Sequence, residues 1–195
     1  STEGRAVMHV ALRAGADAIK VLAWHRPGLS DATRDHQDAF VRDAAAACRR
    51  HDLPFVLELL DYALPDEDPS DPAWQRGITE RVLASLRHYA DPSFGVDLFK
   101  LQAPFDPHRV REVAAGALDG VAREPLWTQA EADAAFREMD ALSPVPWVVL
   151  SAGVGPRAFE FVVDRAVAAG ASGFLAGRAL WLDALDGWPD RAAVA

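Results

Sequence analysis

Lysine is rare in this sequence, and both copies stand inside apolar, strand-like segments. Two of the 20 basic residues are lysines, Lys20 and Lys100, and the others are arginines. They lie within AIKVLAW (18–24) and VDLFKLQAP (96–104). Burial of an unpaired ammonium costs so much free energy that such a group usually gives up its proton instead. The placement therefore favours a role that only a titratable amine can fill.

A carboxylate interrupts a third apolar segment in the same way. Glu58 stands in the middle of FVLELL, and alone it would more often be a structural ion-pair residue than a catalytic one. With two lysines nearby, the charges compensate one another and also form a working unit. A lysine beside a second cation offers a neutral amine for attack on a carbonyl, and a carboxylate can move protons. We therefore predict that Lys100, Lys20 and Glu58 are catalytic.

The last two strand-like segments end in residues that suit a phosphate group. Ser151 and Gly153 end one of them in LSAG, and Gly177 and Arg178 end the other in AGR. Backbone N–H groups, a hydroxyl and a guanidinium are suitable phosphate ligands. Either motif alone is as well explained by a tight turn or a surface arginine. Their placement at the ends of consecutive strands predicts a phosphate-binding site.

The remaining reactive residues give weaker signals. The six histidines show no metal-ligand spacing, and only His25, directly after the first strand, is placed to face a site. A zinc site needs three protein ligands, so we expect no metal and no other cofactor. Cys48, the only cysteine, lies in a helix-like stretch and is expected to be a packing residue. Asp61, Tyr62 and Gln102 lie near strand ends, where they either contact a substrate or cap turns.

Alternating apolar runs and amphipathic stretches supply the elements that must position these residues. Strands are expected at 18–24, 55–62, 96–104, 146–153 and 172–178. Helices are expected at 3–16, 30–52, 74–89, 128–142 and 156–170, with a short helix within 106–123 and a short helical tail. Ser30 or Asp31 is expected to cap the second helix, Thr128 and Glu131 have capping-box spacing, and Pro156 suits a first helical turn.

Strands that alternate with helices predict an α/β fold with a parallel sheet, either open and doubly wound or closed as a barrel. The length of 195 residues favours the open sheet, because an eight-stranded barrel takes about 250 residues. The polar residues favour the barrel, because barrel enzymes gather their catalytic groups from the carboxyl ends of several strands.

Five segments together resemble the tagatose-1,6-bisphosphate aldolase family, which includes the sulfofructose-phosphate aldolases. They are GADAIKVLAW, DLPFVLELLDY, GVDLFKLQAP, PWVVLSAGV and AGASGFLAGRALW, and they span about Gly15 to Trp181. The resemblance implies a (β/α)8 TIM barrel, of which this chain supplies about the last five βα units, strands 4–8. Residues 1–195 would then be the C-terminal part of a single aldolase domain. The three N-terminal βα units, including an acidic Asp-Gln motif after the first strand, are absent from this chain.

The resemblance also implies a class I aldolase, which cleaves a ketose (bis)phosphate such as tagatose 1,6-bisphosphate or sulfofructose 1-phosphate. Its products would be dihydroxyacetone phosphate and an aldehyde. By the matching motifs, Lys100 is the Schiff-base lysine, Lys20 the second active-site lysine and Glu58 the proton-transferring acid. The phosphate would be bound by Ser151, Gly153, Gly177 and Arg178.

Two rival functions remain open at this point. One is a metal-dependent aldolase or isomerase on the same barrel, and the other is a non-catalytic phosphosugar-binding or regulatory relative. A net charge of −9 argues against a general nucleic-acid binder. No apolar run approaches the roughly 20 residues of a membrane span, and the N-terminus lacks a signal-peptide pattern. We expect a cytoplasmic protein whose partner is a phosphorylated ketose, with no nucleic-acid or membrane partner; a homo-oligomer is compatible with the sequence.

Overall fold

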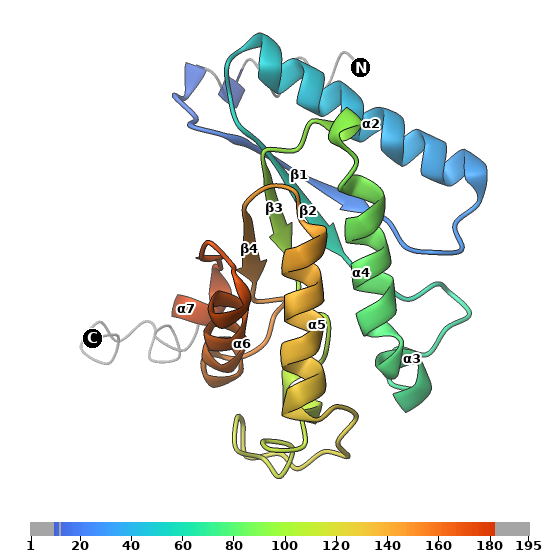
Figure 1. The fold of residues 1–195 in the computed structure, drawn as a ribbon, viewed down its shortest axis with the longest axis vertical. Helices are drawn as coiled ribbons and strands as arrows, with labels where there is room; N and C mark the ends of the chain where they lie inside the picture. Colours follow the sequence, from blue (N-terminus) through green and yellow to red (C-terminus); the bar gives the residue numbers. More distant parts are fainter. Residues whose placement is uncertain (1–9, 12, 182–195) are drawn as a thin grey trace, which may run out of the picture.

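A five-stranded parallel sheet forms the centre of the computed structural model, which describes residues 10–11 and 13–181 (Figure 1). Its strands are β1 (Ile19–Trp24), β2 (Phe55–Leu60), β3 (Leu98–Leu101), β4 (Trp147–Leu150) and β5 (Phe174–Leu175). Each strand pairs in parallel with the next one in the chain, in the order β1-β2-β3-β4-β5. The predicted α/β class and parallel sheet are therefore confirmed.

Helices connect the strands and gather on one face of the sheet. The α-helices are α2 (Asp31–Arg50), α3 (Pro72–Arg76), α4 (Ile78–Tyr89), α5 (Gln129–Leu142), α6 (Pro156–Ala169) and α7 (Arg178–Trp181), and two 3-10 helices are η1 (Pro92–Phe94) and η2 (Pro107–Arg109). In Figure 1, α4, α5 and α6 stand side by side in front of the strands. Right-handed crossovers between sequentially ordered parallel strands place every connecting helix on the same side.

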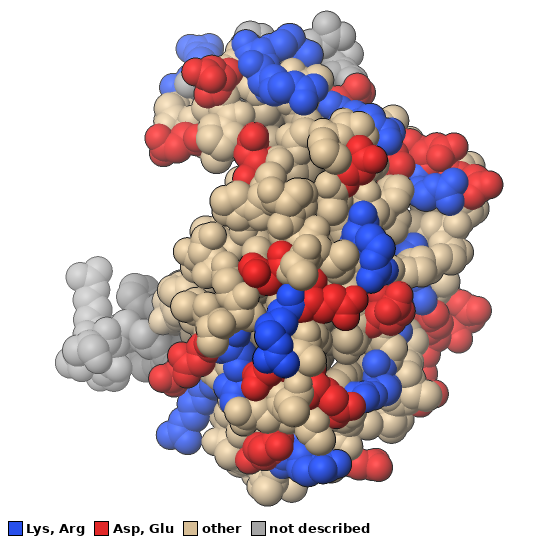
Figure 2. Space-filling model, viewed as in Figure 1, with Lys and Arg blue, Asp and Glu red and all other residues tan. Residues whose placement is uncertain are grey.

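The core lies between this helical layer and the sheet. Alternate strand residues enter it, because successive side chains of a strand point to opposite faces. Phe55, Leu57 and Leu59 enter from β2, and Trp147 and Val149 enter from β4. The residues between them therefore face the opposite side of the sheet. On the outer, helical surface, acidic and basic side chains are interspersed (Figure 2).

Local sequence signals set the helix ends as predicted. The Ser30 hydroxyl accepts a hydrogen bond from the Thr33 N–H at 3.2 Å and begins α2. Thr128 and Glu131 form a reciprocal capping box at the start of α5. Pro156 occupies the first turn of α6, where its missing N–H has no intrahelical partner to lose.

Other expectations need correction. The single helix expected over 74–89 is two helices that meet at Gly77, where a Cβ would stand 2.6 Å from the Arg81 guanidinium. The helix expected within 106–123 is one 3-10 turn followed by irregular turns. The strands are shorter than their apolar runs. Most of the helix expected at 3–16 and of the C-terminal tail lies outside the described residues.

The sheet stays open in the part of the chain that the structure describes. There, β1 pairs only with β2 and β5 only with β4, whereas a barrel joins its first and last strands. A closed barrel is thus not formed by these five strands. No helix within the described ranges is both long and apolar enough to cross a membrane.

Candidate active site

Three neighbouring strands bring Lys20, Glu58 and Lys100 together as the sequence predicts. In the strand register, Glu58 lies opposite Leu22 of β1 and Lys100 of β3. The Lys20 Nζ lies 2.8 Å from Glu58 Oε2, and the Lys100 Nζ lies 3.1 Å from the same oxygen. We call these three residues the lysine cluster.

The lysine cluster lies on the sheet face opposite the helices. Leu57 and Leu59 flank Glu58 in sequence and enter the core, so the period of two turns Glu58 the other way. The Glu58 and Lys100 side chains are 11% and 18% exposed, and that of Lys20 is 47% exposed. Lys20 is therefore less buried than its apolar segment suggests, because β1 has a neighbour on one side only.

Opposing effects act on the Glu58 carboxyl. Burial on its own would raise its pKa, but hydrogen bonds from Lys20 and Lys100 outweigh that effect, and the net pKa of Glu58 is lowered. The carboxylate is consequently charged near neutral pH and able to accept a proton. The cluster carries one more formal positive than negative charge, which favours an anionic ligand or intermediate.

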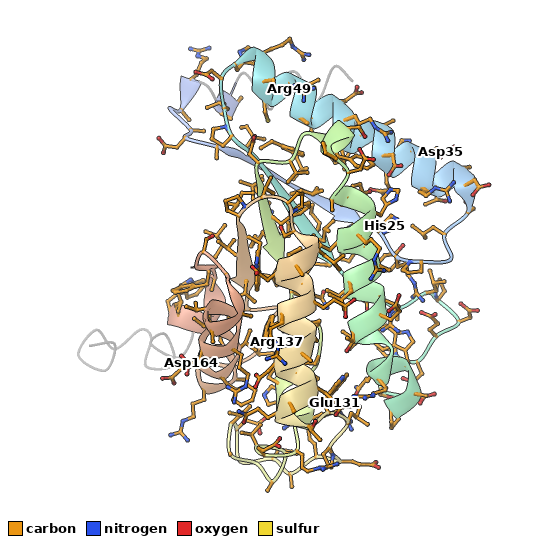
Figure 3. The ribbon with its side chains drawn as sticks, viewed as in Figure 1. His25, Asp35, Arg49, Glu131, Arg137 and Asp164 are labelled. Atoms are coloured by element: carbon orange, nitrogen blue, oxygen red, sulfur yellow. The ribbon has the colours of Figure 1, made fainter. Side chains whose placement is uncertain are left out.

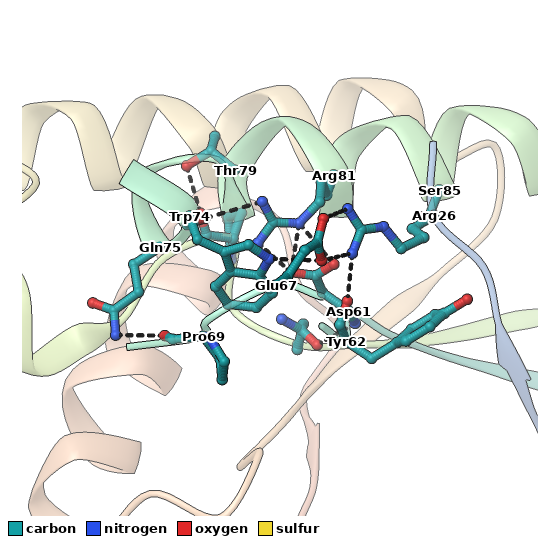
Figure 4. Close-up of polar contacts among 12 residues, drawn as sticks. Arg26, Asp61, Tyr62, Glu67, Pro69, Trp74, Gln75, Thr79, Arg81 and Ser85 are labelled. Carbon is teal, nitrogen blue, oxygen red and sulfur yellow. Dashed lines mark hydrogen bonds and ion pairs between the residues drawn. The ribbon is translucent and has the colours of Figure 1, made fainter. Parts of the chain in front are cut away.

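A second set of charges, which the sequence analysis did not find, fixes the connection that follows β2. We call Arg26, Asp61, Glu67, Trp74 and Arg81 the arginine network (Figure 4). Arg26 donates to both oxygens of Glu67 and to the Tyr62 carbonyl oxygen, the last at 2.9 Å. Arg81 donates to both Asp61 oxygens at 2.7–2.9 Å.

The Glu67 carboxylate is the most heavily bonded member of the arginine network. Besides Arg26, it accepts from the Leu64 N–H and from the Trp74 Nε1, each at 2.9 Å. The Arg26 hydrogen bond first, and then the other two, lower the pKa of Glu67 to about 2. Residues such as those of PDEDP read as solvated loop in the sequence, so only the tertiary contacts show this role.

Asp61 and Gln102 are turn residues in this structure. The Asp61 N–H donates to the Gln102 Oε1 at 2.7 Å, which ties the ends of β2 and β3 together. The Asp61 carboxylate is taken up by Arg81. Tyr62 packs edge-on against Trp24 with ring centroids 5.3 Å apart.

His25 and Cys48 belong to the packed interior. His25 lies buried beside α4 (Figure 3), with its Nδ1 3.1 Å from the Ser85 hydroxyl and its ring stacked on His88 at 4.5 Å. Burial first, and then His88, lower the pKa of His25 to about 4. Cys48 is fully buried, and this burial raises the pKa of its thiol, in agreement with a packing role. Within the described residues, no group of three His, Cys, Asp or Glu side chains is placed to hold a metal ion.

The predicted phosphate-binding residues lie at one end of β4 and β5. Leu150 pairs with Leu175, so Ser151 and Gly177 follow neighbouring strands on the same side. Ala152 and Gly153 have φ values of +48° and +83°, which turn the loop towards α6. A Cβ at Gly153 would meet nothing within 4 Å, so the backbone there is open to an approaching group. The Arg178 side chain lies outside the described part of the structure.

Comparison with known proteins gives a consistent picture. A family model described as DeoC/LacD family aldolase matches residues 6–183. Tagatose 1,6-diphosphate aldolase 1 of Streptococcus pyogenes is 34% identical over 170 residues, which cover 86% of this chain and 50% of that protein. Tagatose 1,6-diphosphate aldolase of Listeria monocytogenes is 33% identical over 174 residues, covering 88% of this chain and 49% of that protein. The chain spans about half the length of these relatives.

Solved structures agree on the fold. A Schiff-base-forming fructose-1,6-bisphosphate aldolase superposes with a TM-score of 0.57 and 19% identity, over 89% of this chain and 55% of that one. An archaeal fructose 1,6-bisphosphate aldolase gives a TM-score of 0.56 and 18% identity, over 89% of this chain and 54% of that one. At this level of identity the likeness concerns the arrangement of strands and helices alone.

Proposed function

This chain belongs to the DeoC/LacD aldolase family, and from that premise we propose that the protein is a class I aldolase acting on a ketose phosphate. The observation that carries the proposal is the lysine cluster, in which Lys20 and Lys100 share one oxygen of Glu58 across three parallel strands. The products are dihydroxyacetone phosphate and an aldehyde. Tagatose 1,6-bisphosphate and sulfofructose 1-phosphate are candidate substrates.

The five strands are, in this proposal, strands 4–8 of a (β/α)8 barrel, and residues 1–195 form the C-terminal part of one domain. Three further βα units outside this chain complete it and line the other half of the site. The open edges of β1 and β5 support this arrangement. So do the exposed apolar side chains of Trp24, Phe174 and Leu175, which a completed barrel would cover.

In the first chemical step, the Lys100 amine attacks the C2 carbonyl carbon of the ketose. The carbinolamine that forms loses water, and the product is an iminium ion on Lys100. The bond between C3 and C4 then breaks as a proton leaves the C4 hydroxyl, the aldehyde departs, and the electron pair passes to the iminium as an enamine. Protonation at C3 and addition of water release dihydroxyacetone phosphate and return the lysine.

Glu58 moves the protons in this scheme. Its oxygen lies 3.1 Å from the Lys100 Nζ, within reach for accepting and returning a proton during dehydration. Its lowered pKa keeps it ionised before the reaction begins. Lys20, 2.8 Å from the same oxygen, orients the carboxylate and stabilises negative charge that develops on substrate oxygens.

The phosphate is held, in the same proposal, by Ser151, Gly153, Gly177 and Arg178. Positive φ values at 152 and 153 form a tight turn, closed by the Val154 N–H that donates to the Ser151 carbonyl oxygen at 3.0 Å, and leave the Gly153 backbone open to an anion. The amino end of α6, which begins at Pro156, adds the positive end of a helix dipole beside that loop.

Reductive trapping tests the mechanism directly. Borohydride added during turnover of a ketose phosphate should fix the adduct and add its mass at Lys100, as read by peptide mass spectrometry. The Lys100→Met variant should show neither the label nor cleavage. An unmodified Lys100 under turnover conditions would rule the mechanism out. Activity that a chelator abolishes but Lys100→Ala retains would indicate a metal-dependent aldolase instead.

A non-catalytic phosphosugar-binding protein is the second candidate. It is favoured by one observation: the sheet of the described residues stays open and leaves the Lys20 side chain 47% exposed, whereas Schiff-base chemistry on the neighbouring Lys100 works best when water is excluded. Calorimetry with dihydroxyacetone phosphate distinguishes the two functions. Binding without cleavage of any ketose phosphate would support the second candidate over the first.

A further inference from the structure

The short helix α3 (Pro72–Arg76) is held by polar contacts rather than by a buried apolar face. None of its residues is buried, whereas α4, which follows it, buries Val82, Leu83 and Leu86. A segment with few buried apolar contacts opens locally at a small cost in free energy. The position of α3 therefore depends on the side chains that bond to it.

Glu67 is the acceptor that ties α3 to the rest of the molecule. The Trp74 Nε1 donates to it at 2.9 Å, and the Leu64 N–H donates to the same oxygen at 2.9 Å. Arg26, a buried residue in the loop after β1, donates to both Glu67 oxygens. One carboxylate thus links α3 to the loop that follows a different strand.

Trp74 is also fixed from a second direction. The Arg81 guanidinium of α4 lies 4.0 Å from the centroid of the Trp74 ring, and the Arg81 Nη1 donates to the Trp74 carbonyl oxygen at 3.0 Å. Glu67 at the ring nitrogen and Arg81 over the ring face therefore hold the indole in one orientation (Figure 4).

Trp74 forms part of one wall of a cavity of about 300 Å³. Gln75 of α3 lies in the same wall, and Gln102, Leu150 and Ser151 are among the residues that line the rest. We call this space the side cavity. Its volume is at the lower end of the range for small-molecule sites, which is enough for a triose phosphate.

The strand register places the side cavity next to Lys100. Lys100 pairs with Val148, and the next residues on the same face of these two strands are Gln102 and Leu150, both of which line the cavity. Two residues along a strand span about 6.6 Å. A triose phosphate that is bonded to Lys100 through its carbonyl carbon and to Ser151 through its phosphate would therefore lie along the side cavity.

The one carboxylate among the described residues of the lining, Asp106, has partners within its own turn. It accepts from the His108 N–H at 2.9 Å, and its Oδ1 lies 3.1 Å from the His108 Nδ1. The Arg109 Nε lies 3.9 Å from its other oxygen. The guanidinium and the N–H group therefore offset the charge of Asp106 towards a phosphate bound at Ser151.

A fixed wall matters because charges and dipoles interact more strongly where water is excluded. If α3 moves away, water reaches the side cavity, and the ligand loses the surfaces of Trp74 and Gln75. The apparent affinity for a ligand then falls in proportion to the fraction of molecules in which α3 is in place.

We propose that Glu67 is a positioning residue for the phosphate-bearing half of the substrate: it holds Trp74, and with it α3, as the wall that shields the side cavity from water. This inference rests on the proposed aldolase function and adds to it how the site is closed on this side. Glu67 acts through Trp74 and does not itself contact the substrate.

Labelling of Lys100 by dihydroxyacetone phosphate measures this effect in the complete natural protein. The Lys100 amine and the ketone lose water to form the iminium ion, and cyanoborohydride adds hydride to the iminium carbon and leaves a stable secondary amine. The concentration of dihydroxyacetone phosphate that gives half of the maximal labelling rate reports the affinity. The maximal rate reports the chemistry at Lys100.

Glu67→Gln is the main variant, because it places an amide NH2 group among N–H donors at nearly unchanged volume. We expect the half-saturating concentration to rise about tenfold and the maximal rate to stay within about twofold, since saturating ligand draws α3 back into place. Glu138→Gln, which breaks the half-exposed pair with Arg87, is the matched control and should change neither value. An unchanged half-saturating concentration in Glu67→Gln would overturn the inference, and so would a fall in the maximal rate alone.

A second variant tests whether Glu67 acts through Trp74. Trp74→Phe keeps an aromatic ring and removes the Nε1 donor, so it should raise the half-saturating concentration by about fivefold. The double variant should resemble the more severe single variant, because both changes break the same contact. Two fold-changes that multiply in the double variant would show that Glu67 acts by another route and would overturn its assigned role.

The same measurement distinguishes failure of this inference from failure of the proposed function. A wild-type protein in which dihydroxyacetone phosphate does not label Lys100 would reject the proposed aldolase function itself. Normal labelling of the wild type together with an unchanged half-saturating concentration in Glu67→Gln would reject only the positioning role of Glu67.

Discussion

Two groups of charged side chains draw residues from β1, β2 and the segments that follow these strands. One group uses lysine as its cation and the other uses arginine. The lysine cluster lies within the strands and brings two ammonium groups to a single oxygen, Glu58 Oε2. The arginine network lies just past the strand ends and joins each guanidinium to both oxygens of its own carboxylate.

The difference teaches which charges can react and which hold the structure. A guanidinium pairs with a carboxylate in a fixed planar fork and stays protonated, whereas an ammonium is a movable point charge that can lose a proton. In a chain that otherwise uses arginine, the two lysines stand at the positions where the proposed mechanism needs an amine. The arginine network in turn positions the connection after β2, including Trp74 and Gln75.

The largest effect should come from exchanging the cation within the lysine cluster. Lys100→Arg keeps the charge and a donor for Glu58 but removes the nucleophile, so aldol cleavage should fall at least about 1,000-fold. Circular dichroism and the unfolding temperature should be close to those of the wild type. Cleavage within tenfold of wild type would show that the two cations are interchangeable and would break the comparison.

The reverse exchange tests the arginine network. Arg81→Met leaves the Asp61 carboxylate buried without its partner, and we expect the free energy of unfolding to fall by about 3–5 kcal/mol. Arg87→Met is the matched control, because Arg87 reaches Glu138 at 3.3 Å with both side chains half exposed, and it should cost less than about 1 kcal/mol. Urea unfolding measures both. Equal losses in the two variants would contradict the structural role of Arg81.

Lowering the pH should test the packing of His25, which precedes Arg26 of the arginine network in the sequence. The pKa of buried His25 is lowered from 6.5 to about 4, chiefly by burial and then by His88, with Asp38 opposing and Arg34 assisting. The unfolded chain therefore binds more protons between these values, and stability falls as the pH falls from about 6.5 to about 4. The loss approaches about 3 kcal/mol. Urea titrations at several pH values should show that His25→Gln removes this dependence of the unfolding free energy on pH. An unchanged dependence in that variant would show that another group causes it.

The smallest effect is expected from a variant outside both the lysine cluster and the arginine network, and it serves as a baseline for them. Thr128→Ala removes the hydroxyl that caps α5 and should lower the free energy of unfolding by about 1 kcal/mol. Aldol cleavage should be unchanged, since α5 belongs to the helical layer, on the sheet face opposite the lysine cluster. A loss of activity at constant fold would show that the helical layer communicates with the site.

Strand periodicity explains why the lysine cluster was predictable. Once β2 and β3 are placed, a period of two turns Glu58 and Lys100 to the same face, and parallel register sets them opposite each other. The ends of α2 and α5 were predictable for a similar reason, because Ser30 and Thr128 act on backbone groups only three residues away.

The arginine network and the break at Gly77 were not predictable. Arg26 and Glu67 are 41 residues apart, and nothing in either local segment distinguishes a fixed ion pair from a solvated loop. Gly77 itself has helical φ and ψ values of −72° and −9°, so the presence of a glycine in the sequence does not fix whether the helix ends there. In the proposed barrel, closure depends on strands outside this chain, so no pattern within the chain reports it.

The sharing of one Glu58 oxygen by two ammonium groups makes the basicity of that carboxylate respond to the state of its neighbours. In the proposed mechanism the Lys100 ammonium gives up a proton before it attacks and is neutral in the carbinolamine, so one of the two cations that hold the proton affinity of Glu58 down is then absent. The carboxylate then binds a proton more strongly, at the step in which water has to be expelled. Formation of the iminium ion restores the second cation and favours release of that proton. The charge of each covalent intermediate would thus set when Glu58 binds a proton and when it releases one.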